Sequence, residues 1–284
     1  MAIVVVTDSS SDLGPAGAAE AGLELVPCLV YFGDDVARDG VDMSVSAFYQ
    51  RLASSPDHPK TTAPPVEAFA ETFSKHVAAG NEVVCVTVSS GLSKTFVNAS
   101  QAATPFAGKV HVVDGKSVSA GTALLATGAA RLARSAPNAA PVLAALQKWV
   151  GREHGHLVYK DYAFLEQGGR IEQKQILLAT KMHLTPLLRI GTTGALESEA
   201  TGKSWDEALE LLVSISARKI ERPEETRVAI VHADIPDVAQ TIAEALGKKV
   251  GHPFEELDLY LAGPTIGANF GPGFLGIFTC EDWA

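Results

Sequence analysis

The sequence predicts a two-domain α/β protein, and the prediction depends on chain length and on how apolar runs alternate with helical segments. The 284 residues suffice for one large α/β domain or for two smaller ones. In the first half, short β-branched runs alternate with helical segments, which is typical of a parallel sheet covered on both faces. Near residue 155 this pattern changes. We therefore expect an N-terminal α/β/α domain with a parallel sheet over residues 1–155 and a C-terminal α/β domain over residues 156–284.

Apolar runs in the first half are predicted as strands, and the segments between them as helices. The expected strands are IVVVTD (3–8), LELVPCLVYF (23–32), EVVCVTVSS (82–90) and KVHVVD (109–114). The expected helices cover 11–22, 45–55, 65–80, 95–103, the alanine-rich run 119–135, and 141–153. The segment HPKTTAPP (58–65) is expected to be extended, because a residue that precedes proline is pushed out of the helical region.

The second half is predicted to mix strands and helices in a different order. The expected strands are 156–165, 184–190, 194–200, 227–233 and 254–263. The expected helices are 171–182, 204–220 and 235–249. The turn GTTG joins the strands 184–190 and 194–200, and the helix 204–220 is amphipathic, with apolar residues at 209, 212, 213 and 215.

The charge balance and the hydropathy argue against two classes of partner. The chain has 23 basic against 33 acidic residues and a net charge of −10, so it lacks the basic footprint that nucleic-acid binding needs. No apolar run approaches the roughly 20 residues that span a bilayer. The opening MAIVVVTD meets Asp8 too soon for a signal peptide, and we expect a cytoplasmic protein with no integral membrane segment.

Metal binding is not predicted. The cysteines Cys28, Cys85 and Cys280 are far apart and form no C-x-x-C pair. His154 and His156 have a spacing that suits a metal pair on a strand, but no third ligand is evident. We expect neither a metal nor a cofactor.

Two segments rich in hydroxyl groups are the candidate functional sites. VSSGLSKT (88–95) predicts a strand that ends in a turn before a helix, where backbone N–H groups and hydroxyls gather. HPKTTAPP contributes Thr61 and Thr62. Such donors, without an evident nucleophile partner, suit holding a carboxylate or a phosphate. The alternative without a ligand is that the serines cap a helix.

Known catalytic motifs come close to this sequence but do not match it. A phosphate-binding P-loop would need glycine at Val88 and Ser93, and a nucleophile elbow around Ser93 would need glycine at Thr95. An aspartyl phosphatase would need aspartate at Ser10. An enzyme stays open as an alternative: a hydrolase or phosphotransferase that uses Ser93 with Asp8 or Asp114, since both aspartates end strands where open α/β sheets bind ligands.

A series of motifs in order along nearly the whole chain resembles the DegV family. The motifs are IVVVTDSSSDL, VPCLVYFGDD, DMSVSAFYQRL, KTTAPP, SSGLSKT, VHVVDGKSVSAG, FLEQGGRI, TPLLRIGTTGAL and IGANFGPGFLGI. The resemblance implies a bacterial fatty-acid-binding protein of two α/β domains with the ligand in a tunnel between them. It implies that Thr61, beside Thr62, and Ser93 hold the carboxylate. Some family members present the acid to a separate ATP-dependent kinase subunit, so the resemblance implies a carrier and not an enzyme.

Burial of the acyl chain would supply most of the affinity. At about 0.8 kcal/mol per methylene, roughly 14 methylenes offer about 11 kcal/mol of gross transfer energy. The carboxylate then only needs hydroxyl and N–H donors to offset its loss of water. The side chains expected to line the tunnel are Phe164, Leu165, Ile266, Phe270, Phe274 and Leu275.

Three positions depart from the family pattern. Lys94 stands where glycine is usual, Asn269 where a histidine is often found, and Lys203 where kinase-partnered members place an arginine. Binding of a fatty acid is therefore better supported than service to a kinase. The predicted ligand-binding residues are Thr61, Thr62, Ser93, Lys94, Arg170, Asn269 and Phe270. A regulatory protein, whose ligand changes a partner surface, would share the same pocket.

Overall fold

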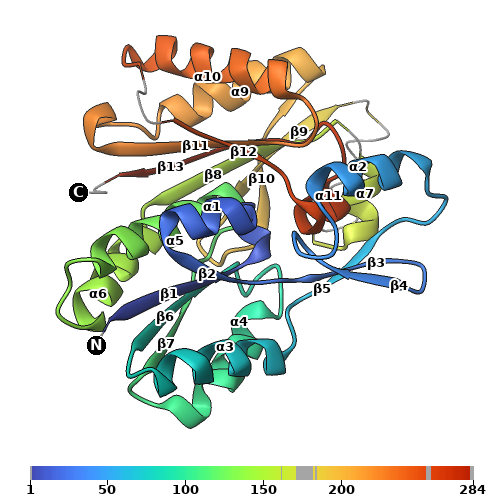
Figure 1. Cartoon of the computed structure of the whole chain (residues 1–284). Helices are drawn as coiled ribbons and strands as arrows, with labels where there is room; N and C mark the ends of the chain where they lie inside the picture. The colour runs from blue at the N-terminus through green and yellow to red at the C-terminus, as the bar shows by residue number, and fades with distance from the viewer. Residues whose placement is uncertain (1, 161, 171–181, 183, 254–256, 282–284) are drawn as a thin grey trace.

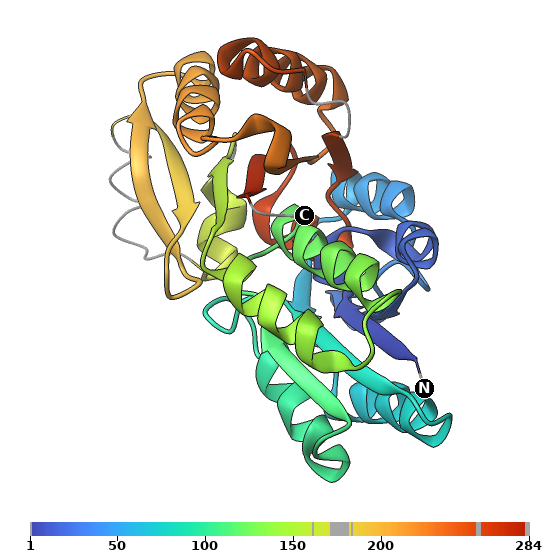
Figure 2. The same cartoon turned by 90° about the vertical axis from the view of Figure 1, so that its left-hand side faces the viewer.

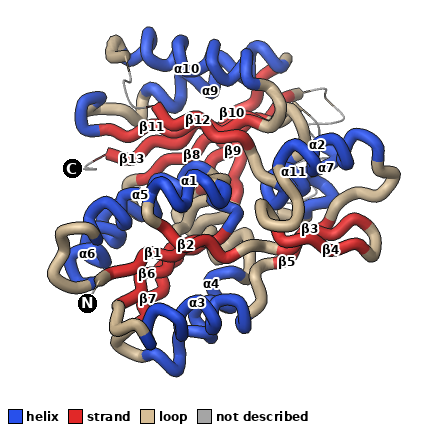
Figure 3. The backbone as a smooth tube through the Cα atoms, in the orientation of Figure 1, coloured by secondary structure: helices blue, strands red, loops and turns tan. Residues whose placement is uncertain are grey.

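The protein is layered, with two sheets that are separated and flanked by helices. The computed structural model describes residues 2–160, 162–170, 182, 184–253 and 257–281 (Figure 1). Figure 3 shows helices above the upper sheet, between the two sheets and below the lower sheet. The predicted fold class, a parallel-sheet domain followed by a second α/β domain, is confirmed.

The first sheet is parallel and four-stranded, in the order β2-β1-β6-β7. Its strands are β1 (Ile3–Asp8), β2 (Leu23–Val26), β6 (Glu82–Thr87) and β7 (Val110–Asp114). The central strands β1 and β6 are covered on both faces, which explains their continuous valine-rich sequences. The outer face packs against α3 (Val66–Ala78) and α4 (Thr95–Ala103).

The second sheet is mixed and six-stranded, in the order β10-β9-β8-β13-β11-β12. Its strands are β8 (Glu153–Val158), β9 (Thr185–Ile190), β10 (Leu196–Gly202), β11 (Thr226–His232), β12 (Leu257–Leu261) and β13 (Leu275–Glu281). Among the described residues of this sheet, only β11 and β12 pair in parallel. The outer face is covered by α9 (Trp205–Ala217) and α10 (Pro236–Val250), which bury an apolar cluster against it.

Helix α5 (Ala120–Ala133) lies between the two sheets and contacts both. In Figure 2 the green helices α5 and α6 (Ala139–Val150) lie between the blue-green strands and the yellow-to-red strands. The sequence AGTALLATGAARLA is apolar or small except for the exposed Arg131 near its end, as expected of a helix that is buried over most of its length. Gly121 allows the close approach, because a Cβ there would lie 2.6 Å from the Phe278 ring.

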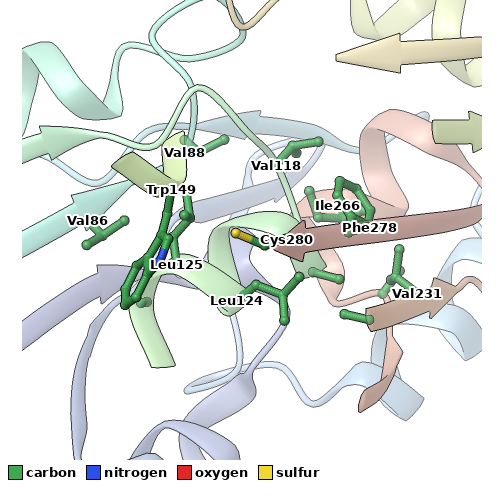
Figure 4. Close-up of a cluster of buried hydrophobic side chains, with 14 of the residues drawn as sticks. Val86, Val88, Val118, Leu124, Leu125, Trp149, Val231, Ile266, Phe278 and Cys280 are labelled. Carbon is green, nitrogen blue, oxygen red and sulfur yellow. The ribbon is translucent and has the colours of Figure 1, made fainter. Parts of the chain in front are cut away.

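The core between the sheets joins the two halves of the chain. Figure 4 shows Leu124 and Leu125 of α5 among side chains from both sheets. Val86 comes from β6, while Val231 and Phe278 come from the second sheet. All five are buried. The two domains therefore share this core.

A small antiparallel sheet projects to one side and packs against segments from the second half of the chain. Its order is β4-β3-β5, and helix α2 follows β4. The elements are β3 (Leu29–Phe32), β4 (Asp35–Arg38), β5 (Lys60–Thr62) and α2 (Val45–Ser54). Helix α1 (Gly14–Ala21) packs elsewhere, against β2 and beside α5. Figure 1 shows α11 (Pro264–Phe270) and α7 (Tyr162–Gly168) next to this unit.

Two of the expected strands are wrong as single elements. The run 23–32 is two strands in different sheets, because Pro27 lacks an N–H and the chain leaves the parallel sheet there. The run 156–165 is also divided: β8 pairs only as far as Val158, and Tyr162–Gly168 forms α7. Strands β4 and β13 and helix α11 are not among the expected elements. The expected helix 171–182 lies outside the described residues except for its last position.

The predicted boundary at residue 155 falls inside β8, all of which pairs in the second sheet. The chain passes from one sheet to the other after α6 ends at Val150. In the described part of the chain, no helix is long and apolar enough to cross a membrane.

Candidate ligand-binding site

A cavity opens where the carboxyl ends of the parallel strands face α11 and the end of β5. Ligands of open α/β sheets bind at this edge. The cavity has a volume of about 50 Å³, and about 460 Å³ of atom-free space when the open solvent at its mouth is counted. It is lined by Ser10, Cys28, Thr61, Thr62, Ala63, Val88, Leu92, Ser93, Val118, Arg170, Thr265, Ile266, Asn269 and Phe270.

Thr61 and Asn269 form a connected pair on one wall. The Asn269 amide nitrogen Nδ2 donates to Thr61 Oγ1 at 3.0 Å and to the Thr265 carbonyl at 2.7 Å. Both amide hydrogens are thus in use. Thr61 accepts one of them, so its own hydroxyl hydrogen is left to donate into the cavity. Asn269 therefore orients Thr61.

Ser93 lies across the cavity, in the turn before α4. Its Oγ is 2.8 Å from Thr95 Oγ1 and accepts from the Thr95 N–H at 3.3 Å. The neighbouring amides already have partners: Ser90 donates to Asp114, Gly91 to Ser89 Oγ, and Leu92 and Ser93 to the Ser89 carbonyl. The turn therefore offers the Ser93 hydroxyl, and few of the free backbone donors that its sequence suggests.

Arg170 is the only ionised side chain among the described lining residues. Its guanidinium donates to the carbonyl of Gly168, the last residue of α7. Burial lowers the pKa of Arg170 from its ordinary value. In the described structure no carboxylate pairs with it, so a partly buried positive charge faces the cavity.

The remaining lining is largely apolar. Val88, Leu92, Val118, Ile266 and Phe270 come from the strand ends, the loops after them and α11. The Phe270 ring stacks on two further aromatic rings, with centroid distances of 5.0 Å to Phe274 and 5.4 Å to Tyr159. The cavity is thus amphipathic, with polar groups on facing walls and aliphatic and aromatic surface beside them.

The structure places the other predicted apolar side chains outside the lining. Phe164 packs against Gly271 and lies 4.9 Å from the His58 ring, centroid to centroid. Leu165 is buried in the core between the sheets, Phe274 lies behind Phe270, and Leu275 faces the core under α9 and α10.

Two lysines that depart from the family pattern also lie outside the cavity. Lys94 is exposed, and its φ of −79° is compatible with any L-residue, so no left-handed conformation is forced on it. Lys203 is exposed before α9, where its N–H donates to Glu207 Oε2 at 2.7 Å.

Both strand-end aspartates accept hydrogen bonds from backbone N–H groups, and no hydrogen bond joins either of them to Ser93 in the described structure. Asp8 accepts from the Val88 N–H at 2.9 Å and from Ser10. Asp114 accepts from the Ser90 N–H at 3.0 Å and pairs with Lys116 at 2.8 Å. No described histidine or carboxylate hydrogen-bonds to the Ser93 hydroxyl.

His154 and His156 lie on β8 beside a second, polar cavity. The His156 Nδ1 is 3.2 Å from Ser216 Oγ. Within the described ranges, no group of three or more histidine, cysteine, aspartate or glutamate side chains could hold a metal ion.

Several lining residues were missed by the sequence prediction. Ser10, Cys28 and Thr265 reach the cavity because the loops after β1 and β2 meet the start of α11. The three serines of TDSSSD were a signal, since they repeat the hydroxyl-rich strand end seen at Ser93. No spacing in the sequence points to Cys28 or Thr265.

Comparison with known proteins identifies the family. A model described as "Uncharacterised protein, DegV family" matches residues 2–282. The chain belongs to the DegV family. The predicted resemblance is confirmed, and it extends over almost the whole chain.

Curated relatives and a solved structure agree with this assignment. A DegV domain-containing protein of Streptomyces coelicolor is 30% identical over 278 residues, covering 97% of each chain. One from Halalkalibacterium halodurans is 28% identical over 280 residues, also covering 97% of each. A Thermus thermophilus DegV family protein, described as fatty-acid binding, superposes with a TM-score of 0.90 at 26% identity, covering 99% of this chain and 100% of its own.

Proposed function

We propose that this DegV family protein binds a long-chain fatty acid in the cavity between the sheet edge and α11, and acts as a carrier for it. The observation that supports this most is the amphipathic lining. Thr61, Ser93 and Arg170 offer donors for a carboxylate, while Ile266 and Phe270 offer apolar contact. The fatty-acid binding described for the Thermus thermophilus relative supports the same ligand class.

Two free-energy contributions indicate how the acyl tail and the carboxylate each take part in the proposed binding. An acyl chain gains about 0.8 kcal/mol per buried methylene, so the tail supplies most of the affinity. The carboxylate costs several kcal/mol when it leaves water, unless its oxygens are hydrogen-bonded. Hydroxyl donors offset part of that cost, and the guanidinium of Arg170 adds a charge-assisted bond.

The structure changes the proposed head-group donors in one respect. Hydroxyls and backbone amides were both expected, but the amides of residues 90–93 already have partners inside the turn. We assign the carboxylate to the hydroxyls of Thr61 and Ser93 and to Arg170. Thr62 borders the same space, and Asn269 supports Thr61 from behind.

The proposal includes a cytoplasmic location and a function without catalysis by this chain. Delivery of the acid to an ATP-dependent kinase subunit is a further step of the proposal. It has less support, because Lys203 stands where kinase-partnered members have arginine and Asn269 carries no charge. Formation of an acyl phosphate when such a subunit and ATP are added to the loaded protein would test it.

Native mass spectrometry of protein purified from a heterologous host tests the carrier. We expect a co-purifying ligand in the mass range of long-chain fatty acids. The double variant Thr61→Ala with Ser93→Ala should lose most of this ligand, whereas Ser46→Ala, an exposed hydroxyl on α2, should keep it. A ligand-free protein that hydrolyses an ester or phosphoester dye would overturn the proposal in favour of an enzyme.

A further inference from the structure

Three carboxylates are buried directly behind the wall of the cavity. Asp8 ends β1, Asp12 follows in the next loop, and Asp39 follows β4. Their exposed fractions are 0%, 8% and 3%. Ionised carboxylates are rarely buried in this way unless a cation pairs with them.

All the hydrogen-bond partners of these carboxylates are neutral. Asp8 accepts from the Val88 N–H at 2.9 Å and from the N–H and hydroxyl of Ser10. None of the three carboxylates forms an ion pair with a described residue. Their negative charges are therefore stabilised by dipoles alone.

Asp39 and Asp12 contact the start of α11, the helix that carries Asn269 and Phe270. Asp39 Oδ2 accepts from Ser9 Oγ at 3.0 Å and from the Thr265 N–H at 3.2 Å. Asp12 Oδ1 accepts from the Gly263 N–H at 2.8 Å, and its other oxygen accepts from the Ser119 hydroxyl.

A single layer of residues separates the three carboxylates from the cavity that would hold the ligand. Ser10, Val88 and Thr265 line the cavity, and each of them hydrogen-bonds to one of the three carboxylates. Cys28 also lines it, with its sulfur 4.0 Å from Asp8 Oδ1. A ligand carboxylate in this cavity would thus add a negative charge close to three buried carboxyl groups that have no cation partner among the described residues.

The groups that face the cluster do not cancel its charge. From α2, the half-buried Tyr49 hydroxyl donates to the Ala262 carbonyl, and Tyr260 on β12 lies near Asp12. Asp234 adds a further negative charge near Tyr49. Arg170, among the lining residues, is the cation available to the ligand itself.

The pKa values of the three carboxyl groups are raised, as expected from their burial without a described cation partner. Burial raises the pKa of Asp39 to about 6, with a further contribution from the charge of Asp8. Burial also raises the pKa of Asp12 well above its usual range, and that of Asp8 to a smaller degree. Because the pKa of Asp39 lies just below neutrality, a modest added field changes its ionisation.

We propose that the Asp8–Asp12–Asp39 cluster takes up a proton from solvent when the acid binds, with Asp39 as the acceptor, so that the site selects an ionised head group together with one proton. This inference rests on the proposed function. The ligand carboxylate stays ionised against Arg170 and the hydroxyls, and a new O–H bond forms on Asp39. No other bond changes.

Linkage gives the sign of the pH dependence. An added negative charge raises the pKa of Asp39 further, so the complex binds more protons than the free protein does. Binding should therefore tighten as pH falls from about 8 toward 6, by up to about tenfold per pH unit. A neutral ligand of the same length should show no such dependence.

Isothermal titration calorimetry of the full chain, stripped of ligand, tests the proposal. Tetradecanoate is titrated at a pH of about 7.5 in phosphate and in Tris, whose ionisation enthalpies differ, which gives the number of protons taken up. We expect a net uptake of up to one proton per tetradecanoate and none for tetradecan-1-ol. The 13C shift of carboxyl-labelled tetradecanoate should be that of the ionised acid.

Matched variants locate the proton. Asp39→Asn should bind tetradecanoate without proton uptake. Asp42→Asn should keep the uptake, since Asp42 is exposed and paired with Arg38 at 2.8 Å. Should Asp39→Asn not fold, the labelled ligand in the unmodified protein decides between the cluster and the ligand as the site of the proton.

These measurements distinguish a failure of the proton-uptake proposal from a failure of the proposed fatty-acid binding. Tight binding of tetradecanoate with no proton uptake would overturn the cluster's role and leave fatty-acid binding intact. Uptake that persists in Asp39→Asn, or a 13C shift of the protonated acid, would overturn the assignment to Asp39. No binding of either ligand would overturn the proposed function, and the inference with it.

Discussion

At the scale of single residues, Glu153 shows how a buried acid sets the pH dependence of stability. It begins β8 and lies beside α5, where a Cβ on Gly121 would be 2.6 Å from its Oε1. This oxygen has no hydrogen-bond partner among the described atoms. Burial raises the pKa of Glu153 from 4.5 to about 8. The folded protein therefore favours the protonated form.

A pH series of urea unfolding experiments should reveal this residue. Because the folded pKa is raised, its contribution to stability is complete below about pH 4.5 and is lost as pH rises through about 8. We expect Glu153→Gln to remove a loss on the order of 4 kcal/mol between the two ends of that range. Glu20→Gln on the exposed face of α1 is the control and should follow the unmodified protein. Parallel pH profiles for Glu153→Gln and the unmodified chain would contradict this account.

Residue types in the sequence predict part of the candidate site. Thr61, Ser93 and Arg170 were singled out from hydroxyl-rich segments and from the family resemblance, and the structure brings them to one cavity. Their role in binding stays a prediction. Thr265 and Cys28 could not be found in this way, because they reach the cavity only through the packing of α11 against the N-terminal half of the chain.

At the scale of secondary-structure elements, the turn that carries Ser93 is held by a hairpin from the other domain. The turn between β9 and β10 approaches it so closely that a Cβ on Gly194 would lie 2.0 Å from Ser89 Oγ. Lys116 adds bonds to both sides, at 3.1 Å to Ser90 Oγ and 3.4 Å to the Thr193 carbonyl. The position of the proposed head-group donor thus depends on the second sheet.

Substitution of Gly194 by alanine tests this contact. Gly194→Ala should lower the free energy of unfolding by about 2–4 kcal/mol, because a positive φ and a steric clash both add to the cost. Gly80→Ala is a matched control: its φ of +80° is close to the +81° of Gly194, but a Cβ there meets no atom within 4 Å. Backbone strain alone should cost it about 1 kcal/mol. Equal losses in the two variants, measured by urea unfolding, would show that the contact contributes nothing.

The elements themselves could be predicted where one local rule dominates. The helix 95–103 and the strands 3–8 and 227–233 match α4, β1 and β11 closely. The run 23–32 could not be assigned correctly from its apolar character, because the choice of sheet on each side of Pro27 depends on tertiary pairing. The short strand β4 is exposed and has no apolar run to mark it.

At the scale of the whole molecule, α5 packs against both sheets, which are formed by successive parts of the chain. Its buried residues contribute to the core that also contains Val86 of β6 and Val231 of β11. Two-domain proteins often unfold in separate steps. Here neither sheet can lose its contacts with α5 without exposing the core of the other, so we expect cooperative unfolding.

Hydrogen exchange across a urea series should report one transition. Peptides that contain β6 and peptides that contain β11 are expected to lose protection at the same urea concentration. Far-UV circular dichroism should give the same midpoint. Two separate midpoints would show that the sheets unfold independently and that α5 stays with one of them.

Because α5 packs against both sheets, the point at which the chain is shortened decides whether apolar surface is exposed. A shortened chain that stops at Arg152 contains every strand of the parallel sheet, but it lacks the partner layer that covers the far side of α5. Such a fragment would expose a large apolar surface, and exposed apolar surface of this kind promotes aggregation. Coexpression of residues 153–284 as a second polypeptide is the arrangement most able to keep it in solution.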